Sequence, residues 1–148
     1  MDERARAFLD QNPTAAMITL RRDGTPHVAR VAVGVVDGHI WSSGTRDRLR
    51  TRFLRRDPRC TLFVFGTGQN AAQWLGLECE TRILDGPDVP EKSLLFFRQL
   101  QRAMPRQRSE DSVFWYGQER TPEEFLQTMR DEGRILYEFE VKRSYGMY

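Results

Sequence analysis

The chain of 148 residues is poor in cysteine, histidine and lysine, and each shortage narrows what the protein can do. Its two cysteines, Cys60 and Cys79, lie in apolar, strand-like runs. This setting predicts two buried reduced thiols and neither a disulfide nor a metal pair. Its two histidines, His27 and His39, have no cysteine or carboxylate at metal-ligand spacing. The sequence therefore predicts no metal site.

Long apolar runs are missing as well. No run of about 18 apolar residues occurs, so no transmembrane helix is expected. The first residues, MDERARAFLDQNP, are charged and amphipathic where a signal peptide would be apolar. We therefore expect a cytoplasmic protein that does not associate with a membrane. The length, with 39% hydrophobic and 30% charged residues, is that of one globular domain over residues 1–148.

Positive charge comes almost entirely from arginine, with 21 arginines against 2 lysines. Seven of these arginines stand in residues 45–60, TRDRLRTRFLRRDPRC, a segment that also holds two aspartates and carries a formal charge of +5. The whole chain carries only +2. Nucleic-acid binding is not expected, because the chain as a whole is near neutral and only Phe53 interleaves these arginines.

Two Asp-Gly pairs, at 23–24 and 37–38, stand between β-rich runs, which is the strongest short-range signal of a hairpin. The residue patterns predict strands over 15–21, 27–36, 39–43, 60–65, 72–84 and 134–142, helices over 3–11, 47–56, 91–104 and from Thr121 to near Gly133, and a polar loop over 105–112. Six strands joined by hairpins, with helices inserted, predict a mainly β fold: a six-stranded antiparallel barrel with peripheral helices.

The arginines of the predicted helix 47–56 fall into two groups. Arg46, Arg48 and Arg50 crowd its N-terminus, where Asp47 or Thr45 is the expected cap. This end of a helix is the positive pole of the dipole, so cations there are unfavourable unless an anion such as phosphate joins them. The sequence therefore predicts an anion site at Arg48 and Arg50. The remaining arginines recur at the spacing of one solvated helix face: Arg52, Arg55, Arg56 and Arg59.

These segments carry a family resemblance. The hairpin region AAMITLRRDGTPHVARVAVGVVDGHIWSSG is followed by a basic segment, by LRRDPRCTLFVF and by LECE. In this order they resemble the split-barrel flavin and deazaflavin oxidoreductases, which are similar to pyridoxamine 5′-phosphate oxidase, and more narrowly their small actinobacterial branch. The resemblance implies a split β-barrel that forms a homodimer, with cofactor sites in grooves between the subunits.

The resemblance also implies a set of cofactor-binding residues. Arg48 and Arg50 would hold the cofactor phosphate, and Ser43 and Thr45 would contact the region next to it. The strand from His27 onward would pass beside the cofactor ring, and Trp74 would reach the groove from the other subunit, where it stacks on the ring or packs in the interface. The implied cofactor-binding residues are Arg48, Arg50, Ser43, Thr45, His27, Val28, Ala29 and Trp74.

The implied reaction is hydride transfer between the cofactor and a small conjugated organic substrate, in which the cofactor supplies the chemistry. The deazaflavin coenzyme F420 is favoured over FMN, because Arg55, Arg56 and Arg59 would suit its longer anionic tail. FMN remains the alternative cofactor, and a non-catalytic cofactor- or tetrapyrrole-binding protein of the same fold remains the alternative function. No catalytic side chain is identified, since His27 is either a proton donor or an ordinary strand histidine.

Overall fold

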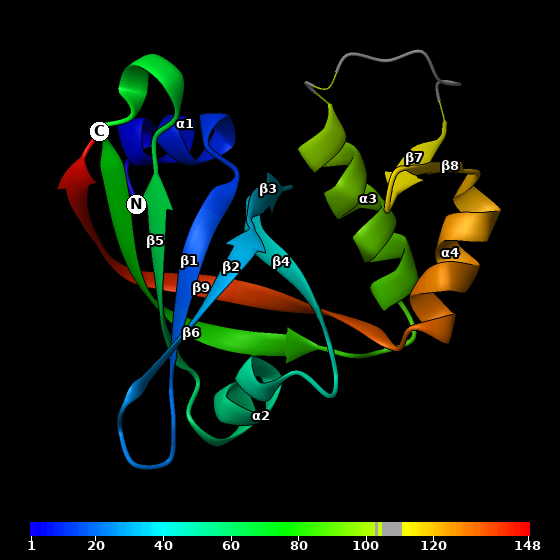
Figure 1. The fold of residues 1–148 in the computed structure, drawn as a ribbon, viewed down its shortest axis with the longest axis horizontal. Helices are drawn as coiled ribbons and strands as arrows, with labels where there is room; N and C mark the ends of the chain where they lie inside the picture. The colour runs from blue at the N-terminus through cyan, green and yellow to red at the C-terminus, as the bar shows by residue number, and fades with distance from the viewer. Residues whose placement is uncertain (103, 105–110) are drawn as a thin grey trace.

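The computed structural model describes residues 1–102, 104 and 111–148 (Figure 1). The polar loop predicted over 105–112 therefore lies almost entirely outside the described residues. The elements are, in chain order, α1 (Glu3–Gln11), β1 (Thr14–Leu20), β2 (Pro26–Ala32), β3 (Gly34–Val36), β4 (His39–Thr45), α2 (Leu49–Arg56), β5 (Arg59–Phe65), a 3-10 turn η1 (Gly68–Asn70), β6 (Trp74–Leu84), α3 (Val89–Gln101), β7 (Val113–Trp115), β8 (Gln118–Arg120), α4 (Pro122–Asp131) and β9 (Arg134–Met147).

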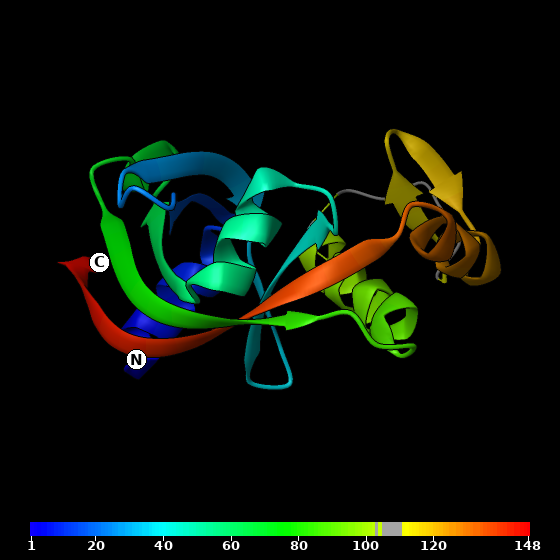
Figure 2. The same cartoon turned by 90° about the horizontal axis from the view of Figure 1, so that it is seen from below.

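Seven strands of the described chain form one antiparallel sheet in the order β2-β1-β5-β6-β9-β4-β3. Its two longest strands, β6 and β9, pair along the whole length of β6 and bend strongly (Figure 2). Its two edge strands, β2 and β3, are consecutive in the chain, so the chain itself connects opposite edges of the sheet. The sheet is therefore curled into a barrel-like shape.

The strand predicted over 27–36 is divided in the structure at Val33. Before this point the chain pairs with β1, and the N–H of Val33 then donates to the carbonyl oxygen of Pro13 (2.8 Å). From Gly34 onward the chain pairs with β4 instead. Gly34 also lies against α3, where a Cβ atom would come within 3.3 Å of α3 side chains. The main sheet of the described chain consequently has seven strands and not the predicted six, while the mainly β fold with peripheral helices is confirmed.

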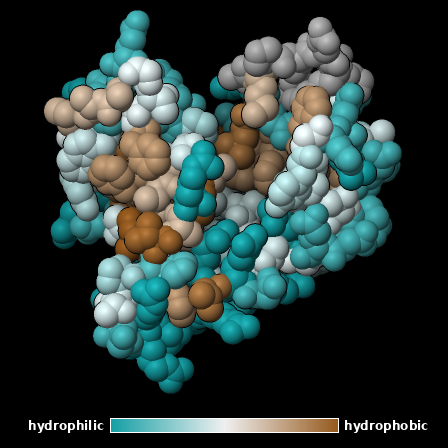
Figure 3. Space-filling model, viewed as in Figure 1, coloured by the Kyte–Doolittle hydropathy of each residue, from teal (hydrophilic) through white to brown (hydrophobic). Residues whose placement is uncertain are grey.

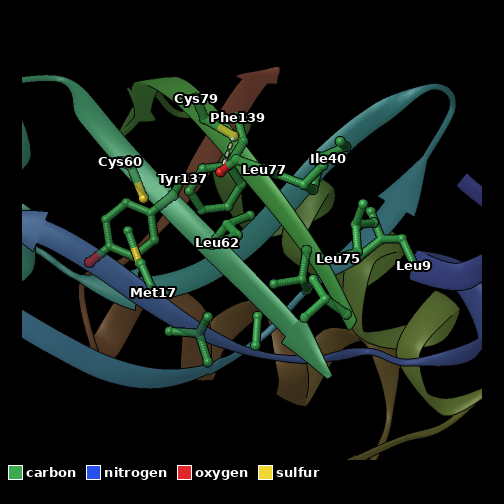
Figure 4. Packing of buried hydrophobic residues seen from close by; sticks show 14 of the residues in the cluster. Leu9, Met17, Ile40, Cys60, Leu62, Leu75, Leu77, Cys79, Tyr137 and Phe139 are labelled. Carbon is green, nitrogen blue, oxygen red and sulfur yellow. Dashed lines mark hydrogen bonds between the residues drawn. The ribbon is translucent and has the colours of Figure 1, made fainter. Parts of the chain in front are cut away.

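The concave face of the sheet holds the main hydrophobic core (Figure 4). Its fully buried members come from the central strands and from α1, and include Leu9, Met17, Leu62, Leu75, Leu77, Ile135 and Tyr137. Cys60 and Cys79 lie opposite each other in the β5–β6 ladder and are buried in this core, as predicted. Both are free thiols. Burial raises the pKa of the Cys60 thiol to about 12, which keeps it protonated and unreactive.

Helices α3 and α4 and the β7–β8 hairpin form a layer beside the barrel (Figure 1). Helix α3 packs Val89 and Phe96 against Trp41 and Leu136 on the outer face of β4 and β9. A further cluster joins α3, β7 and α4: Leu94, Val113, Trp115, Phe125 and Met129. This layer therefore has its own small core, and it touches the barrel along α3.

The β7–β8 hairpin is an element that the sequence patterns do not predict. Tyr116 and Gly117 both have positive φ (48° and 75°), the conformation of a two-residue hairpin turn. Strands of three residues are too short to show a reliable alternation. Within this aromatic segment Trp115 is buried, with 8% exposed, whereas Tyr116 at the turn is 81% exposed.

The ends of α4 and β9 show one confirmed and one corrected boundary. Thr121 caps α4 as predicted, because its Oγ1 accepts from the N–H of Glu124 (3.2 Å) and the Glu124 carboxylate accepts from the N–H of Thr121 (3.1 Å). Strand β9 begins at Arg134 as predicted but continues to Met147, because its second half pairs with the start of β6. No helix among the described residues is long and apolar enough to cross a membrane.

Candidate functional site

A pocket of about 330 Å³ lies between the barrel and the layer of α3 and β7–β8. The space-filling view shows a hollow with apolar side chains at its base between these two parts (Figure 3). Its lining is formed by Arg30, Val31 and Ala32 of β2, Ser43 of β4, Arg50 of α2, Phe96 and Phe97 of α3, Phe114, Trp115 and Tyr116 of the hairpin, and Arg134 of β9. These segments are far apart in the chain, so only the folded protein creates the pocket.

The charged lining of this pocket is positive only. Arg30, Arg50 and Arg134 contribute to it, and no acidic side chain does among the residues that the structure describes. Three lining groups have a buried polar atom without a hydrogen-bond partner in the described chain: Ser43 Oγ, Arg50 Nε and Arg134 Nε. Buried polar groups without partners are unfavourable. Because each of the three can donate a hydrogen bond, the residues present fit an anionic ligand such as a phosphate.

Arg50 is positioned by a short helix that is fastened to the barrel. Its neighbour Thr51 donates its hydroxyl to the carbonyl oxygen of Thr45 (2.7 Å) and accepts from the Tyr137 hydroxyl (2.6 Å). The guanidinium carbon of Arg50 lies 5.6 Å from the centroid of the Tyr137 ring. Gly44 leaves space for that ring, since a Cβ atom there would clash with it. Tyr137 thus connects the core to the helix that carries Arg50.

The start of α2 differs from the predicted one. The helix begins at Leu49 with Arg48 as its N-cap, and no side chain caps it. The two predicted caps bond each other instead: Thr45 donates its hydroxyl to the carboxylate of Asp47, which lowers the pKa of that carboxyl. The correction has a geometric reason, because the helix begins at Leu49, so that Asp47 and Thr45 stand one and three residues before the N-cap position. The first turn therefore holds no acidic residue.

Arg134 lines the same pocket as Arg50. Its backbone pairs with Thr45, so β9 places it beside the end of β4. Burial lowers the pKa of the Arg134 guanidinium, and the charges of Arg48 and Arg50 act in the same direction, while Glu132 and Tyr116 oppose them. The three arginines thus repel one another across a partly buried space, which an anion would relieve.

Ser43 and Arg50 are the two sequence-predicted residues that the structure brings together in this pocket. Arg48 is exposed beside it and does not line it. The hydroxyl of Thr45 is engaged by Asp47. Of the predicted anion site at Arg48 and Arg50, the structure therefore places Arg50 in the pocket together with Ser43, and Arg48 is a neighbouring charge outside the lining.

The predicted residues of β2 lie next to the lining segment of that strand. The His27 ring meets Phe53 of α2 edge-on, with 5.4 Å between ring centroids, and its Nδ1 is buried without a partner among the described residues. Burial lowers the pKa of His27, and Arg21 and Arg50 act in the same direction. Val28 is exposed and Ala29 half-buried, one step before the lining residues of β2.

Trp74 is the predicted site residue that lies elsewhere. It is the first residue of β6 and pairs with Met147 of β9, and its ring stacks on Phe63 with 5.4 Å between centroids. Its ring also meets Tyr145 edge-on at 6.1 Å. Within one chain Trp74 therefore belongs to an aromatic surface on β5, β6 and β9, and not to the pocket.

A larger groove of about 590 Å³ lies along β4, β6 and β9 and is the weaker candidate. Glu138 in its lining accepts a hydrogen bond from Trp41 Nε1 (2.9 Å), pairs with His39 Nδ1 (3.1 Å) and contacts Arg82. Burial opposes ionisation of Glu138, but the hydrogen bonds from Trp41 and Arg82 lower its pKa. The central charges of this groove are thus neutralised within the chain.

The sequence reasoning missed Arg30, Arg134 and Phe97 as pocket residues. No local pattern marks them as members of one site, because their segments are far apart in the chain. The pairing of Thr45 with Arg134 is the contact that brings β9 to the site, and it joins residues 89 positions apart. The one sequence feature that points toward this contact is the alternation of apolar and polar residues in β9, which is typical of a strand that pairs in a sheet.

Comparison with known proteins agrees with this architecture. A family model described as pyridoxamine 5′-phosphate oxidase matches residues 1–143. Solved structures of similar fold include a conserved hypothetical protein from Mycobacterium tuberculosis, with 20% identity, a TM-score of 0.72, and coverage of 99% of this chain and 84% of that chain. An F420 reductase has 16% identity and a TM-score of 0.66, with 98% of each chain covered. A heme binding protein from Mycobacterium smegmatis has 13% identity and a TM-score of 0.66, with 98% of this chain and 52% of that chain covered.

A search of the curated proteins found no match. At these identities the solved structures share the fold with this chain. The family model is stronger evidence of kinship, because it spans nearly the whole sequence, including the hairpin region, the basic segment and most of the last strand. The resemblance inferred from those segments is thereby confirmed: the chain belongs to the pyridoxamine 5′-phosphate oxidase family.

Proposed function

We propose that the protein is an oxidoreductase that transfers a hydride between reduced coenzyme F420 and a small conjugated organic substrate. One observation carries the proposal: Ser43, Arg50 and Arg134 present buried polar atoms without partners in the described chain to a pocket whose described lining has no acid. Membership of the family and the fold shared with an F420 reductase support it.

The residues of the pocket have distinct tasks in this proposal. Arg50 and Ser43 hold the cofactor phosphate, and Arg48 adds positive potential at the start of α2. Strand β2, from His27 to Ala29, lies beside the cofactor ring. The layer of α3 and β7–β8 shields one side of the pocket from water. The bound cofactor supplies the hydride chemistry.

FMN is the alternative cofactor, because it carries the same kind of phosphate. The longer anionic tail of F420 was predicted to meet Arg55, Arg56 and Arg59, but each has a partner within the chain: Arg55 pairs with Asp85, Arg56 donates to the Leu20 carbonyl oxygen and Arg59 pairs with Asp57. The tail would therefore have to displace these partners to bind the three arginines.

A titration of the purified protein with F420 and, separately, with FMN tests the proposal. Tryptophan quenching and cofactor fluorescence are followed at two salt concentrations. Tight F420 binding that weakens with salt supports the proposal, since salt screens the arginines, and it is followed by a turnover assay with conjugated substrates. Preference for FMN replaces the cofactor, binding without turnover indicates a carrier, and binding of neither cofactor overturns the proposal.

A homodimer is the second part of this proposal. Phe63, Trp74, Tyr145 and Met147 form a surface of stacked and edge-on side chains at one end of β5, β6 and β9. Phe63 is 38% and Met147 55% exposed. Exposed apolar patches of this kind mark interaction sites. Phe63→Asp is expected to convert dimers to monomers in analytical ultracentrifugation, and a variant that remains dimeric would contradict this interface.

A further inference from the structure

Arg134 is held in one place by its surroundings. It is the first residue of β9, and its guanidinium carbon lies 4.8 Å from the centroid of the Trp115 ring. Trp115 is itself fixed, because its Nε1 donates to Glu132 (2.9 Å) and its ring meets Phe97 and Phe125 edge-on at 5.0 and 5.8 Å. A guanidinium that stacks on a ring keeps its N–H donors free in the plane of the fork.

This immobilised cation has no counter-charge on the wall that it faces. Its Nε is buried and has no partner in the described chain, and the pocket lining there contains Arg50 and Arg30 but no acid. Glu132 accepts from Trp115 Nε1 and attracts Arg134 electrostatically, but it makes no hydrogen bond or ion pair with Arg134 among the described residues. A partly buried guanidinium whose Nε has no acceptor is costly unless a ligand supplies one.

We propose that Arg134 is an oxyanion ligand of the pocket, presented on the face of Trp115 and acting together with Arg50 and Ser43. This inference rests on the proposed function only where it names the cofactor as one source of the oxyanion. That the pocket binds an oxyanion is inferred from its own residues. A phosphate or a carboxylate presents two oxygen atoms at the spacing that the planar guanidinium fork matches. The aromatic wall of Phe97 and Trp115 favours an oxyanion attached to a flat ring system.

Two sources present this chemistry: the phosphate of the cofactor and a carboxylate of the substrate. The cofactor-free protein is titrated by calorimetry with inorganic phosphate and with anthracene carboxylate, and the neutral anthracene carboxamide measures the contribution of the ring alone. Arg134→Gln is expected to weaken binding of at least one of the two anions about tenfold or more, and to leave the carboxamide unchanged. Arg134→Lys keeps the charge but loses the fork, so a severalfold loss is expected.

Arg52→Gln is the matched control. It removes the same charge from an exposed position of α2 that does not line the pocket. Its effect on either anion is expected to stay within about twofold, because exposed charges are screened by solvent and salt. Thermal unfolding verifies that each variant is folded. If Arg134→Gln does not fold, Arg134→Lys tests the inference instead. A severalfold loss of anion affinity in that variant supports it, and an unchanged affinity contradicts it.

The two sources separate when F420 is titrated into the same variants. A parallel loss of phosphate and F420 affinity in Arg134→Gln assigns the oxyanion to the cofactor, whereas a loss for anthracene carboxylate alone assigns it to the substrate. Equal affinities in wild type and Arg134→Gln, an equal loss in Arg52→Gln, or no binding of either anion to the wild type would overturn the inference. Arg134-dependent anion binding without binding of F420 or FMN would overturn the proposed function and leave this inference standing.

Discussion

The seven arginines of residues 45–60 are alike in the sequence but separate into two groups in the structure. One group binds the protein's own acceptors: Arg46 donates to the Asp85 carbonyl oxygen (2.9 Å), Arg55 pairs with the Asp85 carboxylate (2.9 Å), Arg56 donates to the Leu20 carbonyl oxygen (2.6 Å) and Arg59 pairs with Asp57 (2.8 Å). In the other group, the side chains of Arg48, Arg50 and Arg52 make no hydrogen bond or ion pair with the described residues.

This difference distinguishes arginines that stabilise the fold from arginines that are candidates for binding a ligand. The C-terminal half of α2 is attached to the β6–α3 turn by the pair of Arg55 and Asp85, and Arg56 donates to the Leu20 carbonyl oxygen. The arginines at the N-terminal end make no hydrogen bond or ion pair with the described residues, and Arg50 lines a pocket with Arg134. A cation whose partner is present stabilises the fold, and a cation whose partner is missing is a candidate ligand.

Removing the unpartnered charges tests this comparison with the largest expected effect. Replacing Arg48 and Arg50 together by alanine is expected to weaken F420 binding about 100-fold or more, because each hydrogen bond to a charged group contributes about 1.5–3 kcal/mol. Fluorescence titration measures the affinity. The free energy of unfolding is expected to change by less than about 0.5 kcal/mol, since neither side chain bonds the described chain. Unchanged affinity would show that the phosphate site is wrong.

The hydroxyl that anchors α2 to the core should matter for stability and, through Arg50, for binding. Thr51→Val leaves the Tyr137 hydroxyl without its partner and removes the shorter of two hydrogen bonds to the Thr45 carbonyl oxygen, which keeps the N–H of Arg48. Urea unfolding is expected to show a loss of about 1–3 kcal/mol, the usual cost of a buried unsatisfied group. Thr128→Val is the control, because its exposed hydroxyl bonds only the preceding helix turn. Equal losses in both variants would refute the anchoring role of Thr51.

The charge of Arg50 should be visible in the titration of His27. Burial lowers the pKa of this imidazole, and Arg21 and Arg50 lower it further. Because the folded-state pKa is depressed, the contribution of His27 to stability is present above its unfolded pKa and is lost as pH falls through the folded value. NMR titration should show a higher His27 pKa in Arg50→Ala than in the wild type. A bound phosphate should shift it in the same direction, and identical curves would mean that the two groups do not interact.

Removing the partnered charges should have the smallest effect on binding. Replacing Arg55 and Arg59 together by alanine removes as much positive charge from the segment as the double variant of Arg48 and Arg50. F420 affinity is nevertheless expected to change less than about twofold, because these arginines are paired with Asp85 and Asp57 and exposed to solvent. The same fluorescence titration measures it. A tenfold loss would mean that the cofactor tail displaces these internal partners.

Local chemistry was predictable from the sequence where the partners are close in the chain. The Asp-Gly hairpins, the box of Thr121 and Glu124 at the start of α4, and the burial of Cys60 and Cys79 follow from short-range patterns, and the structure confirms them. The wrong boundary at Val33 arose because both halves of 27–36 have strand character. Only the contacts with Pro13 on one side and α3 on the other divide the segment.

The sequence by itself determined that a strongly positive segment, with Arg48 and Arg50, stands near the start of a short helix, and it predicted an anion site there. The tertiary structure decided which arginines are free to bind one, because an acceptor such as Asp85 or Leu20 is brought to α2 only by folding. It also added Arg134 and the wall of Trp115, which the pairing of β4 with β9 and the packing of α3 place across the pocket. The sequence shows which side chains are charged. Which acceptor each charge binds depends on the distance between residues that are remote in the chain, and that distance is set by folding.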